Sequence, residues 1–126
     1  EQAVERLGFI RPGRTAVIDY PMRRSAEVEV NVALERPTGP ARPLAALGVR
    51  LVPIKAGEVF IARSDHAGVA FFEGVPPGEY EIMVDAEQER VLGLTLARSR
   101  RVVVPAQGGF VRVDDVVVKL TKALPQ

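Results

Sequence analysis

Residues 65–84 constrain the fold most, because they read as two turns and two short strands in direct succession. Residues 65–68 form a polar turn, and the apolar residues 69–72 follow as a strand. Pro76-Pro77-Gly78 makes the second turn, since proline fixes φ and glycine accepts positive φ. Residues 79–85 then alternate between polar and apolar side chains, which predicts a half-buried strand. The side chains expected to face inward from that strand are Tyr80, Ile82 and Val84.

Residues 26–35 show the clearest alternation in the chain. Their apolar face consists of Val28, Val30, Val32 and Leu34, and their polar face of Glu27, Glu29, Asn31 and Glu35. A period of two with one apolar face is typical of a half-buried antiparallel strand. Further strands are expected at residues 15–22, 48–54, 58–63, 91–96, 100–105 and 110–120. Residues 36–43 hold three prolines and are expected to form a loop.

The chain shows no convincing helix, and residues 86–90 read as a polar connection. In the last strand the buried parity shifts at Asp114-Asp115, from odd-numbered to even-numbered valines. Such a shift predicts a bulge or a strand that changes sheets, and a bulge with two carboxylates is a position where a cation could bind. We therefore predict an all-β fold, a seven- to nine-stranded antiparallel Greek-key sandwich.

Composition narrows the classes of function. The chain of 126 residues is long enough for one domain with a core. Its formal charge of +1 gives little attraction to nucleic acid. The absence of cysteine excludes disulfides and thiolate metal sites. No apolar run is long enough for a membrane-spanning helix. Because the chain starts with Glu1, we expect it to be part of a longer protein.

No group of residues predicts catalysis. Ser64, Asp65 and His66 are adjacent, so their side chains do not converge as a catalytic triad requires, and His66 is expected on an exposed turn. The aromatic residues Phe71 and Tyr80 fall at positions expected to face the core, which disfavours base stacking on single-stranded nucleic acid. We expect no enzyme activity, no cofactor and no metal site.

The order of these parts resembles the transthyretin-like, or prealbumin-like, sandwiches. That group includes carboxypeptidase regulatory-like domains and the B-type repeats of Gram-positive adhesins. The shared pattern is a Val-rich strand, a Gly-Val-x-Leu strand, an Asp-x-x-Gly turn, a short aromatic strand and a Gly-Val-Pro-Pro-Gly-x-Tyr unit. In this chain the pattern corresponds to residues 28–34, 48–51, 65–68, 69–72 and 74–80. The resemblance covers about residues 26–120 and implies a sandwich domain, a fold that hosts many roles.

B-type adhesin repeats often carry a self-formed isopeptide bond, and the resemblance raises the question of whether this chain has one. The bond joins a lysine on the first strand to an asparagine on the last and is promoted by a buried acid. Here the first strand has no lysine, the last has no asparagine, and Val84 stands at the position of the acid. We therefore predict that no isopeptide bond forms.

A second resemblance lies at residues 10–24, which read Ile-Arg-Pro-Gly-Arg-Thr-Ala-Val-Ile-Asp-Tyr-Pro-Met-Arg-Arg. This stretch is similar to the part of outer-membrane ushers that leads from the barrel into the C-terminal domains. Ushers assemble pilus subunits together with a periplasmic chaperone. With this reading, residues 1–25 form an extended leading segment with one edge strand, residues 26–122 a sandwich domain, and residues 123–126 a tail.

The function we predict is a non-enzymatic protein-interaction domain of a bacterial envelope protein, on the periplasmic side of the outer membrane or on the extracellular surface. Its most specific form is the C-terminal domain of an usher-like protein, attached to an outer-membrane barrel, that contacts chaperone–pilin complexes through strand edges. A stalk or spacer module and a carbohydrate-binding accessory module of a surface protein or envelope enzyme stay open. The absence of Trp disfavours the carbohydrate-binding module. The candidate contact residues are Ala16, Ile18, Tyr20, Arg36 and Arg42.

Overall fold

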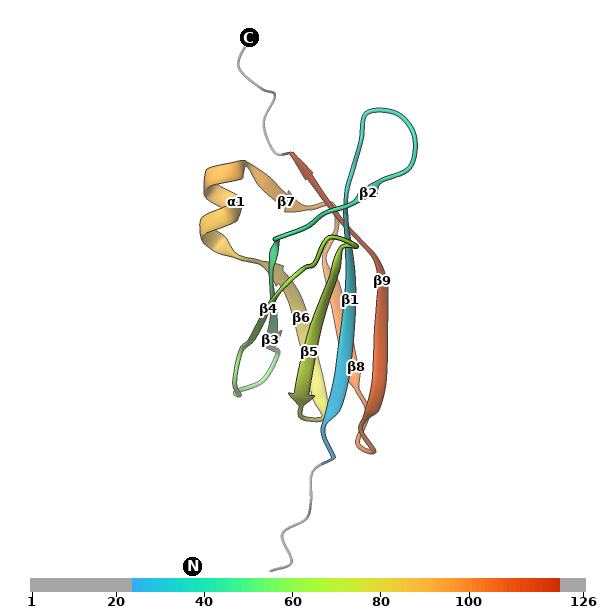
Figure 1. The fold of residues 1–126 in the computed structure, drawn as a ribbon. Coiled ribbons are helices and arrows are strands. Elements are labelled where there is room, and N and C mark those ends of the chain that lie inside the picture. The colour runs from blue at the N-terminus through green and yellow to red at the C-terminus, as the bar shows by residue number, and fades with distance from the viewer. Residues whose placement is uncertain (1–23, 121–126) are drawn as a thin grey trace, which may run out of the picture.

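The computed structural model describes residues 24–120, which form nine strands and one helix in two layers (Figure 1). The elements are β1 (Ala26–Leu34), β2 (Arg42–Pro43), β3 (Gly48–Pro53), β4 (Phe60–Arg63), β5 (Val69–Val75), β6 (Gly78–Val84), α1 (Ala86–Leu92), β7 (Leu94–Leu96), β8 (Arg100–Val104) and β9 (Gly109–Leu120). The predicted all-β sandwich is confirmed, whereas the predicted strand at 15–22 lies outside the described residues. Within this part of the chain the helix is too short to cross a bilayer.

The first and last strands lie side by side in one sheet. That sheet contains β2, β1, β9 and β7 in this order, with β5 also paired to β1, and the second sheet contains β4, β3, β6 and β8. Strands β1 and β9 run parallel through eight register positions, while the other strand pairs of the described residues are antiparallel. The prediction of a fully antiparallel sandwich is therefore wrong for this pair. The chain returns to the centre of the first sheet and runs in the same direction as it started.

The core lies between the two sheets and is built largely of valine. Strands β1 and β6 present the faces that their alternation predicted. These buried residues are Val28, Val30, Val32, Tyr80, Ile82 and Val84. Phe60 contacts Tyr80 edge to face, with ring centroids 6.3 Å apart, which is a favoured aromatic geometry. The alternation of β-branched residues thus accounts for most of the interior.

The predicted bulge at Asp114-Asp115 is confirmed. Val30 lies opposite Val113 on β9, whereas Val32 lies opposite Val116, so β9 holds one extra residue there. Asp115 adopts a φ of 57°, a left-handed conformation that aspartate tolerates better than most residues. The Arg100 guanidinium donates a 2.8 Å hydrogen bond to the Asp115 carbonyl oxygen. The extra residue restores the inward direction of the later valines.

Helix α1 corrects the prediction of a polar connection at 86–90 and a strand from 91. The Asp85 carboxylate caps the helix by accepting a 3.0 Å hydrogen bond from the Gln88 amide, and Gly93 ends it in a left-handed conformation. Caps at both ends favour a helical turn over an extended strand, despite the strand preference of Val91. Strand β7 therefore begins only at Leu94.

Two further predictions need correction in the first sheet. Phe71 was expected in the core, but it is 42% exposed, while its neighbour Phe72 is buried. Successive strand residues point to opposite faces, and the inward face of β5 contains Ala70 and Phe72. The predicted loop at 36–43 also ends in a short strand, β2, which pairs with the end of β1.

Candidate interaction surfaces

A groove of about 560 Å³ lies at the end of the sandwich where β6 begins. The β3–β4 loop and the β5–β6 turn form its walls, and the Ile54 amide joins them by a 3.0 Å hydrogen bond to the Glu79 carbonyl. The Tyr80 hydroxyl donates a 2.7 Å hydrogen bond to the Pro76 carbonyl and so fixes the turn. The apolar lining residues are Pro53, Ile54, Phe60, Pro76, Pro77 and Tyr80. An apolar groove of this size is the common form of a binding site.

The groove is missing from the sequence-based predictions, because two distant loops form it. The turn at 76–78 was recognised as a folding element, but nothing in the sequence pairs it with residues 53–59. Ile54, an apolar residue directly after Pro53 at a strand end, is 41% exposed in the structure. Lys55, Glu58 and Glu79 give the groove a charged rim, and Glu79 is already 3.6 Å from Arg101 on β8.

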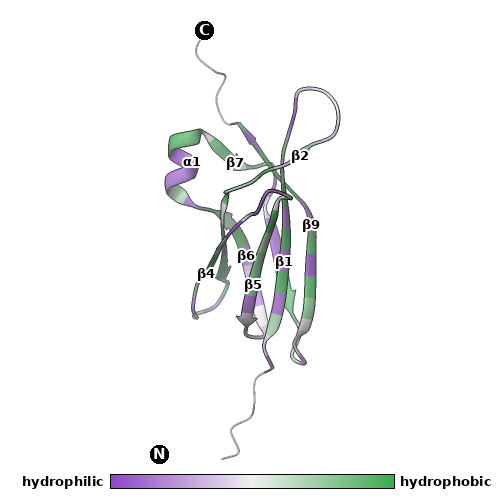
Figure 2. Cartoon of the chain, in the orientation of Figure 1, coloured by the Kyte–Doolittle hydropathy of each residue, from purple (hydrophilic) through white to green (hydrophobic). Residues whose placement is uncertain are grey.

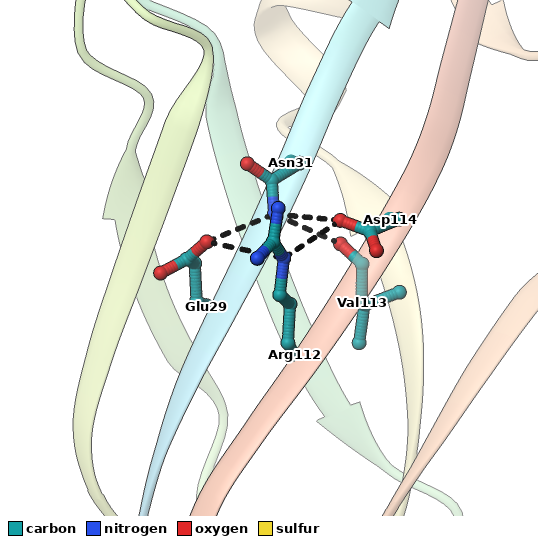
Figure 3. A network of polar contacts seen from close by, with 5 residues as sticks. All are labelled: Glu29, Asn31, Arg112, Val113 and Asp114. Carbon is teal, nitrogen blue, oxygen red and sulfur yellow. Dashed lines mark hydrogen bonds and ion pairs between the residues drawn. The ribbon is translucent and has the colours of Figure 1, made fainter.

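A network of polar contacts covers the outer side of the β1–β9 pair (Figure 3). The Arg112 Nε lies 2.9 Å from the Asp114 carboxylate and 3.6 Å from the Glu29 carboxylate. The Asn31 amide nitrogen lies 3.1 Å from Glu29 and 3.3 Å from Asp114. The hydrogen bond that Arg112 donates to the Asp114 carboxylate raises the pKa of Arg112, so this guanidinium stays charged. The side chains of the two strands are thereby joined across their outer face.

Two phenylalanines stand beside this network on the same outer face. Phe71 on β5 pairs with Glu29 on β1, and Phe110 on β9 pairs with Glu27. Phe110 is 57% exposed and Phe71 is 42% exposed. Of these two exposed rings, Phe71 was predicted to face the core, and no prediction was made for Phe110.

The residues considered for hydrolysis do not form a catalytic site. Ser64 is buried, and its hydroxyl is bound to backbone atoms of Leu44 and Leu47. Asp65 accepts hydrogen bonds from the Val69 and Ala67 amides, of which the first does most to hold the pKa of Asp65 below its usual value. His66 lies exposed in the turn, as predicted. These three side chains shape the β4–β5 turn.

The candidate cation site at the bulge is occupied by protein groups. The Asp114 carboxylate accepts hydrogen bonds from the Arg112 guanidinium and the Asn31 amide. These two side chains supply the positive charge and the donors that a bound cation would otherwise replace. Within residues 24–120 no three acidic or histidine side chains gather as metal ligands. Ca²⁺ normally takes six to eight oxygen ligands, and the bulge offers no such set among these residues.

The predicted contact residues divide between two parts of the chain. Ala16, Ile18 and Tyr20 lie outside the described residues. Arg36 is exposed in the β1–β2 connection, where its Nε donates a 3.0 Å hydrogen bond to the Pro40 carbonyl. Arg42 is exposed on β2, opposite Leu34. Their role in binding stays a prediction.

Solved structures show to which fold this sandwich belongs. A minor pilin of the Gram-positive pathogen Streptococcus agalactiae matches with a TM-score of 0.57 and 14% identity, over 82% of this chain and 49% of the pilin. The full-length major pilin of Corynebacterium diphtheriae matches with a TM-score of 0.50 and 10% identity, over 84% of this chain and 34% of the pilin. A candidate carbohydrate-binding protein of Pseudomonas aeruginosa matches with a TM-score of 0.51 and 13% identity, over 76% of this chain and 88% of that protein.

The comparisons by sequence give no further assignment. No protein-family model matches the chain, and no curated protein matches it. At the identities above, the structural likeness shows the fold alone. The domain is a β-sandwich of the type found in pilins, and it spans less than half the length of either pilin.

Proposed function

We propose that this domain is a non-catalytic, load-bearing spacer module of a bacterial surface protein. The sandwich is similar to part of two pilins, as expected of one module in a longer subunit. Ser64, the one nucleophile next to an acid and a histidine, is buried in backbone contacts. These observations favour a mechanical role over a chemical one.

The parallel pairing of β1 and β9 is the observation that carries the proposal. Residue 24 leads into the start of β1 at one end of the molecule, and β9 ends at residue 120 at the other (Figure 1). A force that separates these ends pulls β1 and β9 in opposite directions along their common axis. The hydrogen bonds between the strands then resist the force together, because they cross its direction. If the two strands were instead separated from one end, their hydrogen bonds would break one after another at a lower force.

Contacts on both sides of this strand pair reinforce its backbone hydrogen bonds. On the inner side, the valines of β1 and β9 are buried in the core. On the outer side, Arg112 connects Glu29 to Asp114 across the two strands. The buried inner side limits the access of water, which competes for backbone groups, and the outer ion pairs add contacts that a force along the strands must also break.

Single-molecule force spectroscopy tests the proposal. The full chain is pulled first through its two ends, and then through cysteines introduced by Ser25→Cys and Gln107→Cys. Both of these positions lie at the end of the molecule where β1 and β9 start, so the second geometry separates the strands from one end. We expect a markedly higher unfolding force in the first geometry. Equal forces in both would overturn the proposal.

The narrower usher function rests on residues 10–24, of which only Arg24 is described. It stays a prediction, as does the likeness to transthyretin-like sandwiches. A pull-down with the full chain as bait, from envelope extracts that contain chaperone–subunit complexes, tests it. Recovery of such a complex would favour the usher over the spacer, and its absence would count against the usher.

Carbohydrate binding is a second candidate function, favoured by the exposed phenylalanines beside the polar network. Sugar rings stack on aromatic side chains and bind carboxylates and amides through their hydroxyl groups. Phe71, Phe110, Glu29 and Asn31 offer these groups on one face, and one structural neighbour is a candidate carbohydrate-binding protein. A glycan array checks this function. Binding that is lost in Phe71→Ala and Phe110→Ala, but kept in Val103→Ala on the other sheet, would support it.

A further inference from the structure

Helix α1 presents apolar side chains that no described residue covers. None of its seven residues is buried, and Val91 and Leu92 are 61% and 54% exposed. Figure 2 shows the hydrophobic colour on this end of the helix. A helix this short is marginal alone and normally gains stability by burying an apolar face. Here the caps and Gln88 hold the helix in place, and its apolar end remains available to another surface.

The apolar end of α1 and the groove lie at opposite ends of the same strand. The groove includes Gly78, the first residue of β6, whereas α1 follows Val84, the last. In Figure 1 the helix and the β3–β4 loop accordingly lie at opposite ends of the sandwich. One molecule therefore offers an apolar protrusion at one end and an apolar groove at the other.

We propose that the groove binds the end of α1 from a second copy of this chain. Val91 and Leu92 of one copy would enter the groove of the next, between Ile54 and Pro77. Copies would then stack end to end, along the direction in which β1 and β9 run. This inference builds on the proposed spacer function and names the partner of its two ends.

One charge beside each surface suits a charge beside the other. On the helix, Glu87 is paired with Arg90 at 2.6 Å, which leaves Glu89 as the second acid of α1, with no ion pair to another described residue. Glu89 lies three positions before Leu92 and thus on the same side of the helix. On the groove rim Glu79 already pairs with Arg101, and Lys55 is the cation that lines the groove, next to the acid Glu58. Glu89 of one copy therefore suits Lys55 of the next.

This contact joins two different surfaces, so it is heterologous and does not close on itself. Few side chains take part, and a pair of free molecules would associate weakly. Molecules held at high density on a cell surface raise the effective concentration and favour the contact. The geometry points to rows of copies held together only where they are crowded.

Cysteine cross-linking tests the contact cleanly, because the chain has no cysteine of its own. One variant of the full chain carries Leu92→Cys and Ile54→Cys. A matched control carries Val103→Cys and Ile54→Cys, since Val103 is 63% exposed on β8, away from the helix. Under mild oxidation we expect the first variant to form a ladder of disulfide-linked oligomers at least ~10-fold faster than the control. Equal rates would overturn the inference.

Charge exchange and single-cysteine variants complete the test. Lys55→Glu should slow the ladder, and Glu89→Lys added to the same chain should restore it. If Leu92→Cys alone forms dimers as fast as the double variant forms its ladder, helix packs on helix and the inference is wrong. A failed ladder together with a high end-to-end unfolding force would overturn the stacking and leave the spacer function standing. A disulfide-linked ladder together with a low end-to-end unfolding force would support the stacking and overturn the spacer function.

Discussion

The hydroxyl group of Ser64 donates a 2.6 Å hydrogen bond to the carbonyl oxygen of Leu44. The Ser64 hydroxyl oxygen accepts a 3.0 Å hydrogen bond from the Leu47 amide, so one buried side chain ties the connection before β3 to the end of β4. We expect Ser64→Ala to lower the free energy of unfolding by about 1–3 kcal/mol, because it leaves buried backbone groups without a partner. Urea denaturation measures this, with the exposed Ser99→Ala as control. An unchanged midpoint would contradict the structural role.

The bulge in β9 makes Asp115 sensitive to substitution. Its φ of 57° is unfavourable for β-branched side chains. We expect Asp115→Val to destabilise the domain by about 1–2 kcal/mol, while Asp115→Gly should be tolerated because glycine adopts positive φ freely. Chemical denaturation of both variants gives the difference. If valine is accepted as well as glycine, the left-handed conformation is wrong.

Gln88 fixes helix α1 to the sheet. Its side-chain oxygen accepts a 2.6 Å hydrogen bond from the Gly48 amide, and its nitrogen donates a 2.9 Å hydrogen bond to the Ala46 carbonyl. We expect Gln88→Leu to free the helix, raise amide hydrogen exchange at residues 86–92 and cost about 1–2 kcal/mol in stability. The exposed Gln107→Leu serves as control. Unchanged exchange in α1 would show that the caps alone hold it.

Asp65 makes stability depend on pH in the acid range. Hydrogen bonds from Val69 and Ala67 lower its folded pKa below the usual 3.8. The stability that the Asp65 carboxylate contributes to the folded state is therefore complete above the unfolded-state pKa. It is lost as the pH falls through the lower, folded-state pKa. We expect NMR titration of the Asp65 carboxyl to show its inflection below 3.8, and Asp65→Asn to remove this part of the acid dependence. An inflection at or above 3.8 would contradict the turn geometry.

No covalent bond is expected between β1 and β9. Val30 lies opposite Val113 in the buried part of this pair, and β1 has no lysine and β9 no asparagine to form an isopeptide bond of the adhesin type. The intact mass of the purified chain should equal its sequence mass. A mass lower by one ammonia would show a cross-link and change the account of load bearing, since a covalent bond would then carry the force.

Local patterns in the sequence predicted the parts of the fold that depend on local chemistry. The inward faces of β1 and β6 follow from alternation, and the parity shift before Val116 located the bulge. Asp85 and Gly93 are cap residues at helical spacing, so α1 could have been found from the sequence. Phe71 and Phe72 gave no such signal, because either of two adjacent phenylalanines can face the core.

The interaction surfaces depend on contacts between distant parts of the chain, and the sequence carries little information about them. The groove needs Ile54 and Pro77 on neighbouring loops. The parallel pairing of β1 with β9 needs a return of the chain through the whole sandwich. No local pattern distinguishes a parallel neighbour from an antiparallel one when both faces alternate in the same way.

The parallel pairing of β1 with β9 determines when the domain is able to fold. Asn31 on β1 meets Asp114 on β9, 83 positions later, and contacts of such long range form late and slowly. A chain that emerges from the ribosome N-terminus first has no partner for one side of β1 until almost the whole domain has been made. The first sheet therefore closes only when almost the whole domain is available to pair.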